Sequence, residues 1–218
     1  MDSNVIVLGS NGLVGSLLLD ILLKSHQYSY ITVFVRKQLE IEHQKLNQII
    51  TDFKDLESLR EHIHGDILFS CLGSTQKKTP NKEDYIFVDI TIPSFFADMA
   101  SRKGLKQIHL VSAVGASSAS PLFYNKIKGQ LEDFIKETEI PSINIYQPSL
   151  ILGNRNEFRL GEKITSFLIK VIDPLLVGSF KKYRSTKALD IAKAMYNVSL
   201  EYKNGVYTYT SDKIKELA

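Results

Sequence analysis

The feature that most constrains the fold of this chain is a glycine-spaced turn close to its first residue. Aliphatic residues 5–8 lead into Gly9, Gly12 and Gly15, and an apolar-periodic segment follows. This order predicts a buried parallel strand, a tight turn and a helix. The three glycines allow an unrestricted φ, close approach of the backbone to a pyrophosphate, and close packing of the helix on the strand.

A helix that begins at this turn presents unpaired N–H groups and the positive end of its dipole, so a dinucleotide phosphate can bind there. The spacing is G-x-x-G-x-x-G and differs from the commoner G-x-G-x-x-G. An ordinary turn between strand and helix is the alternative. We favour the phosphate site because the turn directly follows a predicted strand.

Composition fits a single globular domain and excludes some classes of function. The chain has 218 residues, of which 44% are hydrophobic and 23% are charged, enough to bury a sizeable core. A net charge of +3 without a polybasic run argues against nucleic acid as the main partner. His62 and His64 lie two residues apart and are interpreted as surface residues, so we predict no metal site.

Targeting signals are not apparent in the sequence. Residues 1–4 contain no basic leader, and the apolar run that follows stops at Gly9, so we expect no signal peptide. The most apolar later stretch, 167–176, contains two charges and a proline, so we expect no integral membrane segment. A single cysteine, Cys71, excludes an internal disulfide and suits a reducing compartment. We therefore predict a cytoplasmic protein.

Strands and helices alternate along the chain. The predicted strands are 5–8, 30–35, 47–51, 66–72, 107–111 and 143–146; the predicted helices include 12–24, 54–62, a segment around 88–99, and one with Ile127, Leu131, Phe134 and Ile135 as its core face. Pro93 either kinks the third helix or starts a new segment capped by Thr91. This alternation predicts an α/β fold, a Rossmann-like doubly wound parallel sheet.

We expect one domain over residues 1–218, with a nucleotide-binding core over about 1–150 and a small substrate-side cap over about 151–218. In the tail, 161–172 and 186–200 are predicted helices and 206–210 a predicted strand. A tail this short is expected only to cap the sheet and one side of the site.

Ligands of such sheets bind at the carboxyl ends of the strands. After the second strand, an acidic residue favours NAD, whereas a basic one accommodates the extra phosphate of NADP. This chain has Arg36 and Lys37 there, and a guanidinium can bind a phosphate with two hydrogen bonds. A solvated surface pair is the alternative. The position predicts NADP as the cofactor, with NAD less favoured.

A second group of residues points to proton transfer. The strand over 107–111 stops at Ser112, and the next helix carries Tyr124 and Lys128, four residues apart and therefore on one helix face. An ammonium beside a phenol favours the phenolate, the form that can accept a proton. Lys128 can also hold the nicotinamide ribose, and Ser112 can hydrogen-bond a substrate carbonyl or alcohol. An accidental Y-x-x-x-K pattern is the alternative, and the serine and the glycine turn argue against it.

Together, these residues resemble the short-chain dehydrogenases/reductases of the divergent kind with G-x-x-G-x-x-G. More closely, 71–75, 124–129 and 155–162 resemble the group typified by the Tat-interacting oxidoreductase-like protein, and the likeness runs from Val5 to Lys163. The resemblance implies that Ser112, Tyr124 and Lys128 match the catalytic triad. The typical catalytic asparagine has no counterpart in 95–101.

The glycine turn, the strand ends and the resemblance together give one set of cofactor contacts. The resemblance alone implies that Asp52 and Phe53 flank the adenine, that Leu72 and Gly73 pass near the cofactor ribose and phosphates, and that Pro148 and Ser149 meet the nicotinamide end. The full predicted cofactor set is Gly9, Ser10, Asn11, Gly12, Leu13, Val14, Gly15, Arg36, Lys37, Asp52, Phe53, Leu72, Gly73, Tyr124, Lys128, Pro148 and Ser149.

The predicted function is an NADP-dependent oxidoreductase that transfers hydride between nicotinamide and a small carbonyl or alcohol substrate, acting as a monomer or homodimer. An NADP-binding redox sensor with little or no turnover is the alternative from another class, because divergent members of the group include regulatory proteins. Nucleotide-sugar epimerisation is weakened by the short tail. The polar cluster 154–159 either borders the substrate pocket or is a solvated turn.

Overall fold

A computed structural model describes residues 3–74, 79–153, 173–174 and 176–218. Within them, a single parallel sheet contains seven strands in the order β3-β2-β1-β4-β5-β6-β9. These strands are β1 (Ser3–Leu8), β2 (Tyr28–Val35), β3 (Leu46–Ile50), β4 (Ile67–Ser70), β5 (Gln107–Val111), β6 (Ser142–Gln147) and β9 (Gly205–Thr210). The predicted α/β doubly wound fold is confirmed. Its strand order reverses between β1 and β4, where such sheets bind ligands.

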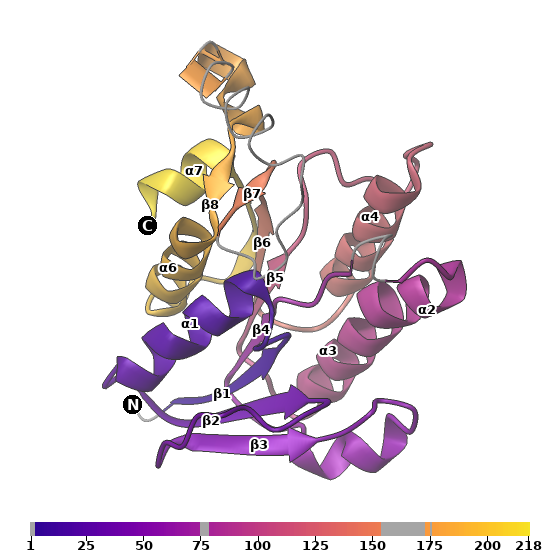
Figure 1. The fold of residues 1–218 in the computed structure, drawn as a ribbon, viewed down its shortest axis with the longest axis vertical. Helices are drawn as coiled ribbons and strands as arrows, with labels where there is room; N and C mark the ends of the chain where they lie inside the picture. Colours follow the sequence, from indigo (N-terminus) through magenta and orange to yellow (C-terminus); the bar gives the residue numbers. More distant parts are fainter. Residues whose placement is uncertain (1–2, 75–78, 154–172, 175) are drawn as a thin grey trace.

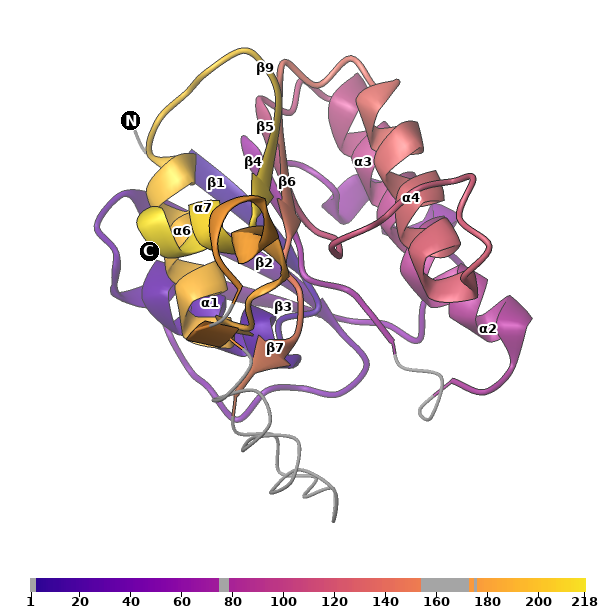
Figure 2. The same cartoon turned by 90° about the horizontal axis from the view of Figure 1, so that it is seen from above.

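Helices cover both faces of this sheet (Figures 1 and 2). One layer contains α1 (Leu13–Lys24), α6 (Ala188–Ser199) and α7 (Ser211–Glu216), and the opposite layer contains α2 (Lys82–Ile86), α3 (Ile92–Arg102) and α4 (Phe123–Lys136). Parallel strands need such crossovers, which bury both faces of the sheet.

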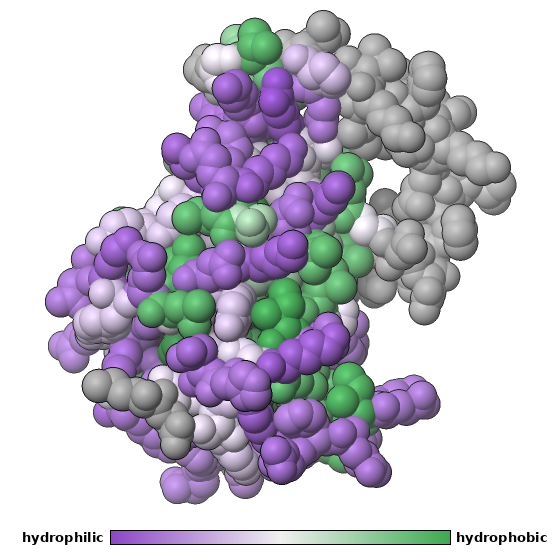
Figure 3. Space-filling model, turned by 90° about the vertical axis from the view of Figure 1, so that its left-hand side faces the viewer, coloured by the Kyte–Doolittle hydropathy of each residue, from purple (hydrophilic) through white to green (hydrophobic). Residues whose placement is uncertain are grey.

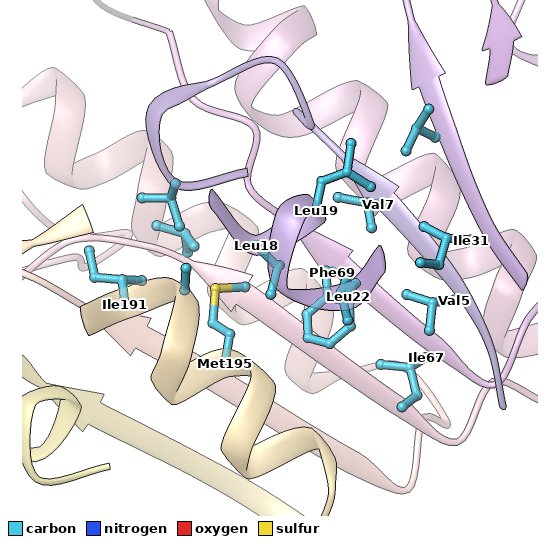
Figure 4. Close-up of a cluster of buried hydrophobic side chains, with 14 of the residues drawn as sticks. Val5, Val7, Leu18, Leu19, Leu22, Ile31, Ile67, Phe69, Ile191 and Met195 are labelled. Carbon is cyan, nitrogen blue, oxygen red and sulfur yellow. The ribbon is translucent and has the colours of Figure 1, made fainter. Parts of the chain in front are cut away.

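The core beneath α1 and α6 is mostly aliphatic, with the ring of Phe69 among its side chains (Figure 4). Leu18 and Leu22 of α1 lie between the strands and Met195 of α6, and all three are fully buried. Val5 and Val7 of β1 point into the same cluster because side chains on one face of a strand recur every second residue. The helix predicted over 12–24 therefore buries the face that its periodicity indicates.

The core beneath α3 and α4 is built around aromatic rings. Phe96 packs edge-on against Phe34, with 4.6 Å between the ring centroids, and also contacts Phe53. Ile135 and Leu131 of α4 are buried here as predicted, but Phe134 is 38% exposed. The prediction of Phe134 as a core residue is wrong. The buried face of α4 includes Lys128 and Glu132, so it differs from the purely apolar face that was predicted.

The helix before β5 is interrupted by a wider turn. A π-helical segment, η2 (Phe87–Thr91), joins α2 to α3. Pro93 has no N–H to donate to the carbonyl of Asp89, four residues earlier, so the regular helical ladder cannot pass through this point. A new helical segment, α3, does begin directly after Thr91, as one of the two alternatives predicts, but Thr91 has helical dihedrals and its side chain makes no cap hydrogen bond.

The tail does more than cap the sheet. β9 pairs in parallel with β6 along its whole length and lengthens the sheet by one strand. α6 lies beside α1 in the same layer (Figures 1 and 2), which places residues 188–199 on the main core. The expectation that the tail would only form a cap is therefore wrong for these residues. The helix predicted over 161–172 lies outside the described residues.

Short elements complete the described structure. A 3-10 helix, η1 (Glu57–His62), occupies most of the helix predicted over 54–62, and η3 (Gly178–Tyr183) precedes β8 (Thr186–Lys187), which pairs with β7 (Ile151–Leu152). On the outer surface of the α1, α6 and α7 layer, hydrophobic residues lie in small areas separated by hydrophilic ones (Figure 3). No described helix is long and apolar enough to cross a membrane.

Candidate functional site

The glycine turn brings three backbone segments closer together than side chains would permit. Gly9 has a φ of +76°, and a Cβ at this residue would lie 2.7 Å from the carbonyl oxygen of Cys71, at the end of β4. A Cβ at Gly15 would lie 2.1 Å from the carbonyl oxygen of Gly9. Glycine is therefore required at both positions. The turn closes with a hydrogen bond from the Gly12 N–H to the Gly9 carbonyl, at 2.9 Å.

The start of α1 is open to an anion. No side chain caps the helix at Gly12, so the first N–H groups of α1 are free to bind another acceptor. The hydroxyl of Ser10 is buried in the turn without a hydrogen-bond partner. A buried hydroxyl without a partner is uncommon, and a ligand oxygen in the turn would satisfy it.

A cavity of about 590 Å³ lies beside this turn. It is open at the carboxyl ends of β1, β4 and β5, the switch point of the sheet. Eight of the predicted site residues line it: Gly12, Leu13, Val14, Leu72, Gly73, Ser112, Tyr124 and Lys128. The fold thus brings the glycine turn and the predicted serine, tyrosine and lysine to one place; the catalytic roles of these three remain predictions.

Tyr124 and Lys128 lie in the first half of α4 but differ in exposure. Tyr124 is 44% exposed, whereas the Lys128 side chain is 3% exposed. Gly129, the next residue, allows this arrangement, because a Cβ there would lie 2.1 Å from the backbone of Ser117. The loop between β5 and α4 therefore packs directly on the helix beside the cavity.

The ammonium of Lys128 forms an ion pair that the sequence reasoning missed. Its Nζ lies 3.0 Å from Oδ1 of Asp89, whose side chain is completely buried. The other carboxylate oxygen, Oδ2, accepts the backbone N–H of Ser74 at 2.8 Å. Lys128 also donates to the carbonyl of Leu72 at 3.4 Å. Asp89 thus links the loop after β4 to α4, from the π-helical segment where irregular geometry often marks function.

Ser112 lines the cavity and is also tied to a buried acid. Its hydroxyl donates to Oε1 of Glu132 at 2.5 Å. The amide of Gln147 donates to both carboxylate oxygens of Glu132, at 2.8 and 3.1 Å, and Lys136 reaches Oε2 at 3.4 Å. Glu132 was also missed. Its signal was present, because Lys128 and Glu132 recur at i and i+4 among the apolar residues of α4.

The predicted cofactor residues after β2 and β3 are not among those that line the cavity. Arg36 and Lys37 directly follow β2 and are exposed, and neither forms an ion pair with another described residue. Asp52 is exposed, and the backbone N–H of Lys54 lowers the pKa of its carboxyl group. Phe53 has a φ of +63° and its ring is buried against Phe96, so its ring is not free to stack on an adenine.

Pro148 and Ser149, which were predicted to meet the nicotinamide, lie within the described residues. Pro148 accepts the N–H of Val114 through its carbonyl, and the N–H of Ser149 donates to the hydroxyl of Ser211. The polar cluster 154–159 and the rest of the stretch to 162 lie outside the described residues.

Cys71 lines the cavity but its environment suppresses the thiolate. Burial raises the pKa of the thiol to about 12, although the nearby Lys128 opposes this shift. Thiolate is the nucleophilic form, so this residue behaves as a small hydrophobic group. Among the described residues, no cluster of His, Cys, Asp or Glu could hold a metal ion.

Comparison with known proteins agrees with this geometry. Residues 9–163 match the family model described as NAD(P)H-binding. Protein HTATIP2 of Rattus norvegicus is 28% identical over 200 residues, covering 90% of this chain and 81% of that protein. The mitochondrial protein FMP52 of Meyerozyma guilliermondii is 36% identical over 152 residues, covering 69% of this chain and 66% of that protein.

Solved structures with low sequence identity share the fold. The Bordetella bronchiseptica enzyme WbmG, solved with NAD, has a TM-score of 0.69 at 16% identity, covering 99% of this chain and 76% of that one. UDP-glucose 4-epimerase of Thermotoga maritima, solved with UDP-glucose, has a TM-score of 0.69 at 15% identity, covering 98% and 80%. The oxidoreductase ylbE from Lactococcus lactis has a TM-score of 0.65 at 18% identity, covering 98% and 94%.

Proposed function

We propose that this chain, which belongs to the NAD(P)H-binding family, is an NADP-dependent oxidoreductase that acts on a small carbonyl or alcohol compound. One observation carries the proposal. Tyr124, Lys128 and Ser112 line the same cavity as the glycine turn, although β2, β3 and β4 separate them from that turn along the chain. A phenol, an ammonium and a hydroxyl beside a dinucleotide site form a set that can move a proton to or from a substrate oxygen.

The residues present fit a nicotinamide cofactor. Gly9 and Gly15 let the turn pack directly against the end of β4 and the start of α1, and the buried hydroxyl of Ser10 lacks a partner in that turn. The pyrophosphate is assigned to this turn and the start of α1, and the 2′-phosphate of NADP to Arg36 and Lys37. When bound, the cofactor supplies or accepts the hydride.

Each side chain of the proposed triad has a separate task. Tyr124 transfers the proton at the substrate oxygen, and its exposure at the cavity wall leaves the phenol accessible. Lys128 follows Tyr124 by one turn of α4 and supplies the positive charge of the site, and its ion pair with Asp89 stabilises the buried ammonium. Ser112 orients the substrate beside the phenol.

The test of the triad compares variants of the purified chain on a carbonyl and alcohol panel with NADPH or NADP⁺. We expect Tyr124→Phe to abolish turnover and to leave cofactor affinity nearly unchanged. Tyr202→Phe, at another exposed tyrosine, is the matched control and should keep turnover. Unchanged turnover in Tyr124→Phe would contradict the assignment. Tight cofactor binding without turnover on any panel member would instead favour the redox sensor.

The cofactor preference has its own test. Fluorescence titration with NADPH and NADH should give tighter binding of NADPH, and Arg36→Ala should weaken NADPH by about tenfold and leave NADH unchanged, as expected for loss of a charge-assisted contact to a phosphate. Arg60→Ala is the control, because this exposed arginine pairs with Glu57 on η1. Equal affinities for the two cofactors in the native chain would reject the preference for NADP.

Location and assembly complete the proposal. We place the protein in the cytoplasm as a monomer or homodimer, on the basis of its single cysteine and unremarkable charge. The FMP52 relatives carry the description mitochondrial, so cell fractionation is the deciding measurement for location, and light scattering decides the assembly.

A further inference from the structure

Ser112 has one hydroxyl proton, and the structure uses it in a hydrogen bond to another side chain. A serine hydroxyl can donate one hydrogen bond and accept two. Here the proton is donated to Glu132 at 2.5 Å, so only the acceptor positions of Ser112 remain for a ligand in the cavity. As long as this hydrogen bond to Glu132 is kept, Ser112 cannot donate to a substrate carbonyl.

The surroundings of Glu132 suit a hydrogen-bond acceptor. It is 3% exposed, and the described groups that hydrogen-bond it all donate to it: the Ser112 hydroxyl, the amide of Gln147 and the ammonium of Lys136. A protonated carboxyl group would itself need an acceptor. A carboxylate accepts at both oxygens, as observed. The direction of the bond from Ser112 to Glu132 follows.

The reacting oxygen of the substrate exchanges one proton. In the proposed function, the single proton exchanged at that oxygen passes to or from Tyr124. Ser112 can neither give a proton to this oxygen nor receive the one that Tyr124 uses. A ligand satisfies both residues when it carries a second donor, next to the reacting carbon, that Ser112 can accept.

We infer that Glu132 is a positioning residue that turns Ser112 into a hydrogen-bond acceptor, so that the cavity selects carbonyl or alcohol compounds with a neighbouring hydroxyl group. This inference rests on the proposed function and adds the class of substrate. The α-hydroxy carbonyl compounds and vicinal diols are the smallest members of that class.

The test compares two probes that differ by this hydroxyl group, 2-hydroxycyclohexanone and cyclohexanone. Their binding to the chain loaded with tetrahydro-NADP is measured by saturation-transfer NMR, because this analogue can neither give a hydride to a ketone nor take one from the hydroxyl group. We expect the native chain to bind 2-hydroxycyclohexanone about three- to tenfold more tightly, as one hydrogen bond allows. Ser112→Ala should remove this preference by weakening the hydroxyketone alone.

Variants at Glu132 separate positioning from structural support. Glu132→Met removes the acceptor and frees the Ser112 proton, so cyclohexanone should bind about three- to tenfold more tightly and the hydroxyketone more weakly. Glu132→Gln keeps a carbonyl oxygen for Ser112 and should retain the native preference. Asp133→Asn removes a charge from the exposed side of α4 and should match the native chain.

The outcomes separate the two proposals. If Ser112→Ala weakens cyclohexanone as much as the hydroxyketone, if Glu132→Met leaves the preference unchanged, or if the native chain binds neither probe, the inference is wrong. Selective binding of the hydroxyketone without turnover on NADPH would support the inference and contradict the proposed function. Turnover of simple ketones with no effect of the neighbouring hydroxyl would support the proposed function and contradict the inference.

Discussion

The two faces of the sheet bury polar groups in different ways. Beneath α1 and α6, a network of buried hydrogen bonds joins neutral side chains, whereas beneath α4 the buried polar side chains include Asp89, Lys128 and Glu132. A buried charge costs more free energy than a buried neutral group, even when it is paired. These buried charges lie beside the cavity, which indicates that they serve the site and not the stability of the fold.

The neutral face has a complete chain of hydrogen bonds. Tyr146 shares a bond of 3.0 Å with Nδ1 of His109, Nε2 of His109 lies 3.2 Å from Oε1 of Gln107, and the Gln107 amide donates to the carbonyl of Ser199. This chain is satisfied when the imidazole is neutral and protonated on Nε2. Burial lowers the pKa of His109 to about 3, which agrees with a neutral ring.

The largest effect should follow from removing one charge beneath α4. Asp89→Ala leaves the ammonium of Lys128 buried without its partner, and we expect a loss of about 3–5 kcal/mol in the free energy of unfolding, measured in urea. Asp98→Ala breaks an exposed pair with Arg102 and should cost at most about 1 kcal/mol. Equal losses in the two variants would remove the distinction between the faces.

The next effect is the response of the neutral face to acid. The unfolded chain protonates His109 below its ordinary pKa of 6.5, whereas the folded chain resists protonation down to about pH 3, so stability falls as the pH is lowered through this window. We expect this residue to cost about 2 kcal/mol at pH 5.

Urea unfolding across this pH range checks the acid response. His109→Gln should reduce the slope of stability against pH by one proton, and the exposed His26→Gln should leave it unchanged. An unaltered slope in His109→Gln would show that the ring titrates normally in the fold.

A smaller effect is expected for a single neutral bond. Tyr28 shares a hydrogen bond of 2.6 Å with Ser199, and burial raises the pKa of its phenol to about 12. Tyr28→Phe should cost about 1 kcal/mol in thermal or urea unfolding. Tyr30→Phe, at an exposed site on the same strand, should cost less than about 0.5 kcal/mol. A loss as large as that of Asp89→Ala would contradict the comparison.

The smallest change in stability is expected when both partners of the ion pair are replaced. The double variant Asp89→Leu with Lys128→Met removes two buried charges together, and such replacements are often neutral or stabilising. We expect a free energy of unfolding within about 1 kcal/mol of the native chain, with loss of the proposed turnover. Strong destabilisation of the double variant would assign the pair to the fold instead of the site.

Much of the fold could be predicted because its signals are local. The periodicity of Leu18 and Leu22 and the alternation of strands and helices give the elements and the parallel sheet. The sequence predicted a strand over 206–210, close to the observed β9, but assigned it to a cap. The residues of β9 are exposed or half-buried, and a sequence pattern does not reveal which strand lies beside it. The π-helical turn before Pro93 has no periodic signature.

The candidate site was predictable where residue type and strand end coincide. Ser112 follows that rule, Tyr124 and Lys128 were predicted from their four-residue spacing on one helix, and the structure places all three at one cavity. Asp89 and Glu132 could not be assigned in the same way, since each acts through a contact between elements far apart in the sequence. A charge on an apolar helix face is the signal that would have identified them.

The neighbouring positions of α1 and α6 have a consequence for the order in which this protein is made. The first helix of the described chain packs on a helix that begins at residue 188, so a growing polypeptide on the ribosome leaves the side of α1 that contacts α6 uncovered until most of the chain has emerged. The α3 and α4 layer, by contrast, can close over its strands once residue 147 is available. Chaperones that bind nascent chains would therefore meet the α1 side for longest.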